Sequence, residues 1–240
     1  MSRALAAALV LLGPAAAGAA GLEASLDVAS RYSWRGIARA DAFVLQPGLH
    51  LRNVAGTGLF ARAWGSTALD HRDAVRVEDE VDLGAGIRRK LGPVAAAAAV
   101  TVAWFPSTPG GGRRTEELSA SLQVSARVAD LDLRPHLLAA RDVGLFDATY
   151  LRAGVSPRLD FRQAVKVYPR AWVGFGDFGP PARGFGFQDA AVEIDVEWAP
   201  WAYRDVALTA GPRLVREEVT APGWHLAAAA GVRWRKALGF

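Results

Sequence analysis

The sequence predicts an all-β protein: a single antiparallel, up-and-down transmembrane β-barrel of about twelve strands, preceded by a cleaved signal peptide. Three observations lead to this fold class. Polar and apolar residues alternate along many segments, these segments are long for strands, and short turns alternate with longer loops between them.

Composition narrows the class of protein. The chain has 240 residues, enough for one large all-β domain or two small ones, and 51% of them are hydrophobic against 22% charged, as in a folded chain. It has no cysteine, which excludes disulfides, thiolate ligands, cysteine nucleophiles and a lipid-modified N-terminal cysteine. The formal net charge is +4, but the arginines are spread along the chain and matched by acids, so no nucleic-acid partner is predicted.

Residues 1–20 have the three parts of a secretory signal peptide. Arg3 is the positive region, residues 5–12 form the apolar region, and Ala17 to Ala19 offers a small-x-small cleavage site. The apolar region is too short for a membrane-spanning helix, which needs about 20 residues, and no later segment is long and apolar enough. We therefore expect an exported chain with a signal peptide at 1–20 and a barrel domain at 21–240.

Residues 188–198 show the strand pattern most clearly. One parity holds Asp189, Ala191, Glu193, Asp195 and Glu197, and the other holds only alanine, valine, isoleucine and tryptophan. Successive side chains of a strand point to opposite faces, so this segment has a carboxylate face and an apolar face. In a membrane barrel these would face the aqueous lumen and the lipid.

The first half of the chain repeats this alternation. Residues 22–34 set leucine and valine against Glu23 and Asp27, and residues 75–89 set valine, leucine and isoleucine against Glu78, Glu80 and Asp82, with Asp79 as an exception. The alanine run at 95–99 has helical propensity, but its brevity and the following V-T-V-A-W-F favour a strand. The predicted strands here are 22–34, 43–53, 58–69, 75–89 and 94–105.

The second half continues in the same way. Leucine, valine or phenylalanine occupies one parity of each segment, while Arg134, Arg152, Lys166, Arg170 and Arg213 are among the residues on the other. The predicted strands are 117–128, 131–140, 149–161, 165–175, 188–198, 206–215 and 224–236.

Strand length and loop length both favour a membrane barrel. The predicted strands have roughly 10–13 residues, against about 5–6 in soluble proteins and about 9–11 for a tilted membrane-spanning strand. Short turns alternate with longer loops, and an even strand count leaves both termini on the periplasmic side. Prolines inside the predicted strands oppose this fold, because proline removes a ladder donor, and we expect bulges or different strand limits there. They are Pro47, Pro135, Pro157, Pro169 and Pro212.

Aromatic residues gather at the predicted strand ends. Two belts of amphipathic rings are expected at the two membrane interfaces. Beside the longer loops we predict Trp34, Phe43, Trp104, Phe175 and Trp224, and beside the short turns or the C-terminus Phe161, Trp198 and Trp234.

Three segments carry a resemblance to a known group. They are S-R-Y-S-W-R-G-I at 30–37 with the following Gln46, G-L-F-A-R-A-W-G-S at 58–66, and E-V-D-L-G-A-G-I at 80–87. They resemble the opening third of an uncharacterised family of proteobacterial outer-membrane proteins, which has an S-x-Y-x-x-R-G-I segment. The resemblance implies a barrel in the bacterial outer membrane.

The end of the chain adds to this expectation. Phe240 resembles the terminal aromatic residue that directs outer-membrane proteins to the barrel assembly machinery, although the residues from Lys236 to Gly239 interrupt the usual alternation. The partners expected are that machinery, outer-membrane lipid and lipopolysaccharide. The sequence does not specify an oligomeric state.

Catalytic and metal sites are not predicted. The chain has neither a G-x-S-x-G elbow nor a histidine pair with ligand spacing, and its single asparagine is Asn53. Without these patterns we expect no enzymatic activity, no cofactor and no bound metal.

Charged residues on the polar parity form the candidate site. Acids concentrate on two strands and bases on their neighbours, and opposite charges on facing strand positions are favourable. We expect a passive, porin-like channel for small hydrophilic solutes, in which these strips orient the solute. The alternatives are a structural or loop-displaying barrel whose charges pair across the lumen and plug it, and a soluble periplasmic β-sandwich. The predicted lumen residues are Arg62, Glu78, Glu80, Asp82, Lys166, Arg170, Asp189, Glu193, Asp195, Glu197, Arg213 and Arg233.

Overall fold

The computed structural model describes residues 20–69, 79–107, 112–128, 131–161, 164–178, 184–200, 205–220 and 222–238. The predicted signal peptide, except Ala20, lies outside these residues, as do Glu78 and Phe240. Within the described part of the chain, no helix is long and apolar enough to cross a membrane.

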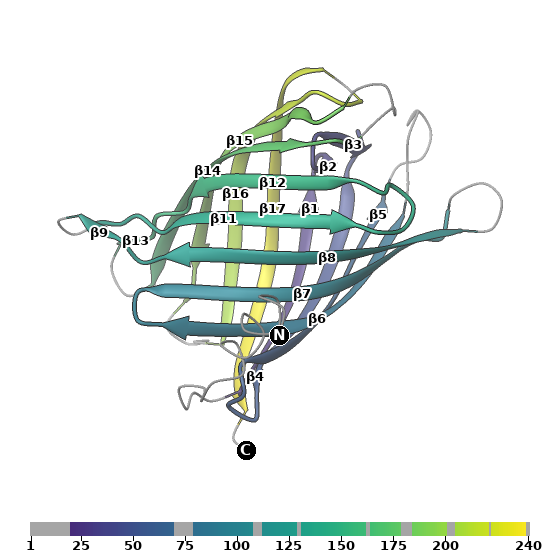
Figure 1. The fold of residues 1–240 in the computed structure, drawn as a ribbon. Helices are drawn as coiled ribbons and strands as arrows, with labels where there is room; N and C mark the ends of the chain where they lie inside the picture. The colour runs from purple at the N-terminus through teal and green to yellow at the C-terminus, as the bar shows by residue number, and fades with distance from the viewer. Residues whose placement is uncertain are drawn as a thin grey trace, which may run out of the picture.

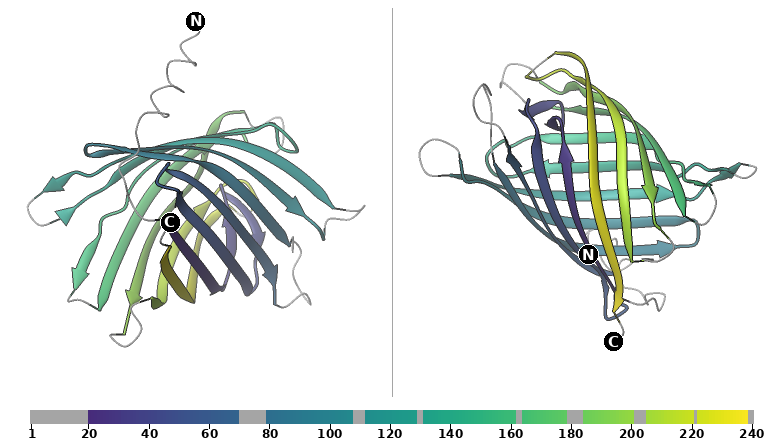
Figure 2. Two further views of the ribbon diagram at one scale, coloured as in Figure 1. Left: turned by 90° about the horizontal axis from the view of Figure 1, so that it is seen from below. Right: turned by 180° about the vertical axis from the view of Figure 1, so that it is seen from behind.

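Twelve antiparallel strands close into one barrel (Figure 1). Neighbours in the chain pair with each other around the ring, and the first strand pairs with the last. Figure 2 shows the strands running obliquely around the barrel. The barrel strands are β1 (Ala20–Ala29), β4 (Val44–Val54), β5 (Leu59–Ala68), β6 (Glu80–Leu91), β7 (Val94–Phe105), β8 (Arg113–Val124), β11 (Pro135–Asp142), β12 (Thr149–Val155), β14 (Val165–Gly176), β15 (Gly186–Trp198), β16 (Val206–Glu217) and β17 (Gly223–Leu238).

Five short strands lie outside the ring order or extend it. The hairpin of β2 (Tyr32–Trp34) and β3 (Ile37–Ala40) follows β1, and the hairpin of β9 (Arg127–Val128) and β10 (Leu131–Asp132) follows β8. The strand β13 (Leu159–Phe161) continues the line of β12 along β14. All twelve predicted strands therefore correspond to barrel strands, with different ends.

Two predicted strand limits are wrong. The first strand ends at Ala29 rather than 34, because the chain turns at Ser30 into the β2–β3 hairpin. The strands predicted at 117–128 and 131–140 are each interrupted: β8 ends at Val124 and β11 begins at Pro135, and between them the chain forms the β9–β10 hairpin, in which Val128 pairs with Leu131. In both places local alternation continues beyond the point where the backbone leaves the ring.

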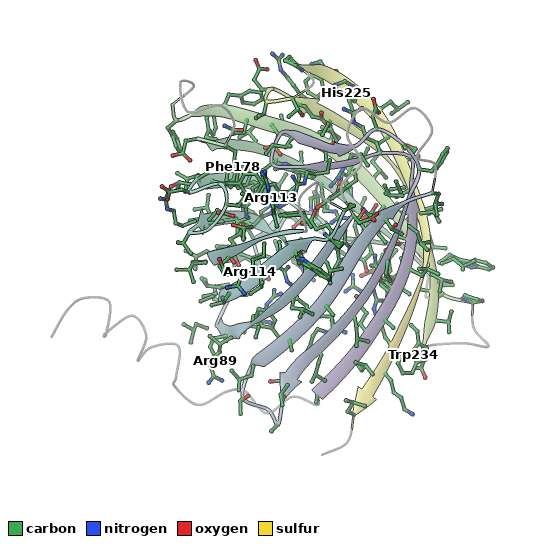
Figure 3. All side chains as sticks on the ribbon, turned by 90° about the vertical axis from the view of Figure 1, so that its right-hand side faces the viewer. Arg89, Arg113, Arg114, Phe178, His225 and Trp234 are labelled. Atoms are coloured by element: carbon green, nitrogen blue, oxygen red, sulfur yellow. The ribbon has the colours of Figure 1, made fainter. Side chains whose placement is uncertain are left out.

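The apolar parity covers the outside of the barrel. On β15, Val192, Ile194 and Trp198 are exposed while Glu193 and Glu197 are buried, so the carboxylates face inward. Every other barrel strand except β4, β5 and β11 exposes two or more large apolar side chains, and those three expose one each. Figure 3 shows side chains projecting from both faces of the wall. A closed ring with an apolar outer band is a membrane barrel, so the β-sandwich alternative is wrong.

The strand prolines occupy interruptions of the hydrogen-bond ladders. Pro135 begins β11, and Pro157 lies between β12 and β13. Pro169 lies on β14 between Val167, which pairs with β13, and Ala171, which pairs with β12. The other two face gaps in their ladders: Pro47 in β4–β5 and Pro212 in β15–β16. Proline lacks the amide hydrogen that these positions do not use.

Candidate functional site

The carboxylates of β15 are neutralised along the barrel wall. Glu193 forms one ion pair with Arg170 on β14, at 3.2 Å, and another with Arg213 on β16. Asp195 also pairs with Arg170. Both arginines lie on the strands adjacent to β15. The predicted acidic and basic strips thus meet side by side rather than across the lumen.

A second charged group forms nearer the short turns. Glu197 is buried and accepts two hydrogen bonds from Arg235, at 2.9 and 2.7 Å. Lys166 lies 3.4 Å from Glu197 and Arg233 lies 3.8 Å from it, while Arg235 also bonds Glu23 on β1 at 2.8 Å. The predicted residues Lys166, Glu197 and Arg233 are therefore brought together, with Arg235 as a partner that sequence reasoning missed.

The acids of β6 stand apart from this group. Glu80 is buried and accepts a hydrogen bond of 2.9 Å from the Tyr32 hydroxyl. Arg62 crosses the inner face of Gly84 to donate a hydrogen bond of 2.8 Å to Thr101 on β7. A Cβ at Gly84 would lie 2.8 Å from the Arg62 Nε atom, so the glycine makes room for this side chain. Asp82 lines the same cavity as Arg62.

The β2–β3 hairpin lies across the loop-side mouth of the barrel. Arg31, just before β2, donates hydrogen bonds of 3.1 and 2.8 Å to Glu217 on β16. Arg35, at the hairpin turn, pairs with Glu117 on β8, which lies nearly opposite β16 in the ring. Because its arginines bond both walls, the hairpin spans the mouth.

Arg39 makes a third contact of the same kind, 3.7 Å from Glu80 on β6. Backbone contacts add to it, since Val219 N–H donates to the Gly36 carbonyl at 3.2 Å and Ala38 N–H donates to Thr220 Oγ1 at 2.6 Å. Burial lowers the pKa of Arg35, and the Glu117 carboxylate opposes that shift. The hairpin is thus fastened by charge-assisted bonds inside a poorly hydrated mouth.

Aromatic rings pack around these arginines. The Trp34 ring lies 4.9 Å from Phe178 in an edge arrangement, and the Arg35 guanidinium lies 4.6 Å from the Trp34 centroid. Arg39 lies 4.2 Å from the Phe105 ring. Trp34 therefore lies in the mouth and not in the outer belt that the sequence predicts for it.

The other predicted belt residues lie on barrel strands or beside them. Phe43, Trp104, Phe161, Phe175, Trp198 and Trp224 are all exposed. Trp234 is half-buried near the C-terminal end of β17, and Figure 3 shows it at the end of the strand opposite His225. Trp34 departs because the chain leaves the wall at Ser30, before the ring could reach the interface.

The lumen contains three neighbouring cavities. The upper cavity, about 370 Å³, lies below the hairpin and is lined by Arg35, Asp82 and Asp189 among others. The side cavity, about 200 Å³, shares Arg213 with it. The lower cavity, about 230 Å³, shares Leu138 and Arg152 with the upper one. Arg152 therefore lies where the upper and lower cavities meet.

Several lumen residues were missed from the sequence. Arg31 lies in the predicted strand 22–34 and Arg35 and Arg39 in the break that follows it, and their regular spacing of four residues was the available signal. Glu117 and Glu217 each belong to a pair of adjacent acids, with Glu116 and Glu218, and no alternation marks which acid of the pair faces the lumen. Among the described residues, no group of three or more His, Asp or Glu side chains is placed to hold a metal ion.

The fold and the charged lumen define a transmembrane β-barrel, the architecture of bacterial outer-membrane proteins. Three solved structures share it. The NanC porin has a TM-score of 0.59 at 9% identity, covering 88% of this chain and 98% of the porin. LpxR from Salmonella typhimurium has a TM-score of 0.57 at 8% identity, covering 88% of this chain and 99% of LpxR. The KdgM porin has a TM-score of 0.54 at 11% identity, covering 88% of this chain and 98% of the porin.

These likenesses show the fold, and the protein is an outer-membrane β-barrel. No protein-family model and no curated protein matches the chain. The resemblance of residues 30–37 to an uncharacterised outer-membrane family therefore stays a prediction. At these identities the shared fold specifies no activity.

Proposed function

We propose that this barrel is a passive, porin-like channel for small hydrophilic solutes and that it has no enzymatic activity. The observation that carries the proposal is the direction of the charge pairing. Glu193 and Asp195 bond neighbouring strands rather than residues across the lumen. Pairing of this kind does not draw these side chains across the lumen, and three neighbouring cavities remain inside the barrel.

The hairpin sets the size limit of the proposed channel. It occupies the mouth above the upper cavity, so a solute has to pass beside Trp34 and Arg35. A narrow mouth with charged walls favours small polar solutes over large or apolar ones. The exposed apolar band implies contact with outer-membrane lipid, and we propose lipopolysaccharide and the barrel assembly machinery as the further partners.

Planar-bilayer recordings of the purified, refolded protein test this function. We expect discrete conductance steps, and a reversal potential in a salt gradient that reports the preferred ion sign. Heat-denatured protein in the same detergent is the control. Currents no larger than those of that control would overturn the channel.

The plugged barrel is the second candidate, and the hairpin favours it. If the bonds of Arg31 and Arg35 hold permanently, the mouth stays shut. The two candidates separate in the same recordings with a Glu217→Gln variant, which weakens the Arg31 attachment. A silent wild type together with a conducting variant would identify a plug, whereas steps in both identify a channel.

A further inference from the structure

Two arginines stand at the ends of one cross-strand row on the inner wall. Arg88 on β6 pairs in register with Ala97 on β7, and Ala97 pairs with Ser121 on β8. Ser121 then pairs with Leu138 on β11, and Leu138 with Arg152 on β12. With strands spaced about 4.8 Å apart, the row covers roughly 19 Å of curved wall. Both arginines line the lower cavity, and so do the three residues between them, Ala97, Ser121 and Leu138.

The adjacent row completes the lining. Gln123 pairs in register with Ala95 and with His136, and His136 pairs with Gly154. A Cβ at Gly154 would lie 2.9 Å from the His136 Cε1 atom, so the glycine gives the imidazole its place. The alanine side chains of β7 are too short to fill the space on this side, which explains why a cavity remains here.

The lower cavity has donors but no acid. Its described lining includes Arg88, Arg152 and His136 and no Asp or Glu. Arg88 donates to the neutral Gln123 amide at 3.2 Å, and Arg152 stacks on Trp172 at 5.4 Å. Within the described residues neither arginine has a salt bridge, and the Arg152 Nε atom is buried without a hydrogen-bond partner. Asp189, which interacts electrostatically with Arg152, is bonded by the Tyr150 hydroxyl at 2.8 Å.

The arginines of β14, β16 and β17 differ from these two, because each bonds a carboxylate. The part-buried Arg152 guanidinium has no bonded counter-charge, which is unfavourable, and an anionic ligand would reduce that cost. Arg88 is exposed and adds a second positive charge beside the same cavity. Arginine also offers paired donors that match the oxygens of a carboxylate or a phosphate.

We propose that the lower cavity is a binding site for a small oxyanion, a carboxylate or phosphate group held by Arg88 and Arg152 with Ser121 and His136 beside it. The inference rests on the proposed channel by naming its solute class: the site lies beside the upper cavity, with which it shares Arg152. Binding there is weak enough to let the solute leave, as conduction requires. The volume of about 230 Å³ limits the ligand to a small molecule.

Phosphorus NMR of inorganic phosphate tests the site in detergent that contains no phosphorus. We expect the phosphate line to broaden saturably with the wild-type barrel and to narrow again when acetate competes. Arg152→Met and Arg88→Met should each weaken phosphate binding about tenfold to a hundredfold, because a bond to a charged group contributes about 1.5–3 kcal/mol. Arg152→Lys keeps the charge but loses the paired guanidinium donors, so its phosphate affinity should lie between those of the wild type and Arg152→Met.

Arg114→Met is the matched control, because it removes the same charge from an exposed position of β8. A gel-mobility shift on heating confirms that each variant has folded. Equal broadening by wild type and Arg152→Met, or failure of acetate to compete, would overturn the site. Phosphate binding without conductance would refute the channel but support the binding site. Conductance without phosphate binding would support the channel but refute the binding site.

Discussion

Arg31 and Glu217 are separated by 185 intervening positions and form a two-bond ion pair that ties the first loop to the end of β16. The side chains are 7% and 0% exposed, so the pair is shielded from water. Ser33 also bonds Glu217, which makes this carboxylate the main attachment of the hairpin to that wall.

Glu217→Gln should release one side of the hairpin. Breaking a buried ion pair costs about 3–5 kcal/mol when the remaining charge has no other partner. Arg31 keeps its ion pair with Asp41, so the loss should lie below that range. We expect a lower temperature for the gel shift of the folded barrel and larger or more frequent conductance steps. Arg216→Met removes an exposed pair with Glu218 next to it and should cost at most about 1 kcal/mol. An unchanged conductance in Glu217→Gln would mean that the hairpin does not restrict the mouth.

Gly36→Ala should displace the hairpin turn. Gly36 has a φ of 76°, and a Cβ there would lie 2.2 Å from the Gln188 carbonyl oxygen on β15. Gly56→Ala has nearly the same backbone, with a φ of 71°, but meets nothing within 4 Å. Both variants carry strain of about 1–2 kcal/mol, so the difference between them isolates the clash. Gly36→Ala should be less heat-stable and more conductive than Gly56→Ala; equal behaviour would contradict the close packing of this turn.

Glu193→Gln should shift ion selectivity toward anions. The substitution keeps the shape of the side chain but removes the charge that faces Arg170 and Arg213. The positive charges of both arginines are then less neutralised, and the reversal potential in a salt gradient should move in the direction of greater anion selectivity. Asp160→Asn is the control, since Asp160 is exposed and its partner Arg158 lies outside the barrel strands. A selectivity equal to that of wild type would place the conduction path elsewhere.

Val100→Arg should destabilise the barrel in a bilayer. Val100 lies at the middle of β7 and is 49% exposed on the lipid-facing side. Arginine at the midplane costs about 2–4 kcal/mol, whereas near the interface it costs about 0–1 kcal/mol. Val94→Arg is the matched control, because Val94 has the same parity at the end of the same strand. Urea unfolding from lipid vesicles measures the difference, and equal losses for both variants would show that this face does not contact lipid.

The barrel wall could be predicted from the sequence because its determinant is local. Along residues 188–198 each side chain meets either the lumen or the lipid, so a period of two marks the strand and both its faces. The same logic located Glu193, Arg170 and Arg213 on the inner face. It did not show that they would pair along the wall, since that depends on the register between β14, β15 and β16.

The mouth and the lower cavity depended on the closed ring. The sequence predicts residues 30–34 as the end of a strand and 35–40 as a loop. Only closure of the ring brings β8 and β16 to opposite sides, where Arg35 and Arg31 bond them. Likewise Arg88 and Arg152 share a cavity because five strands align in register. The sequence by itself determined the strands, their two faces and the inward charges, through alternation between neighbouring residues. The tertiary structure decided which charges meet, because those contacts join positions that are far apart in the chain.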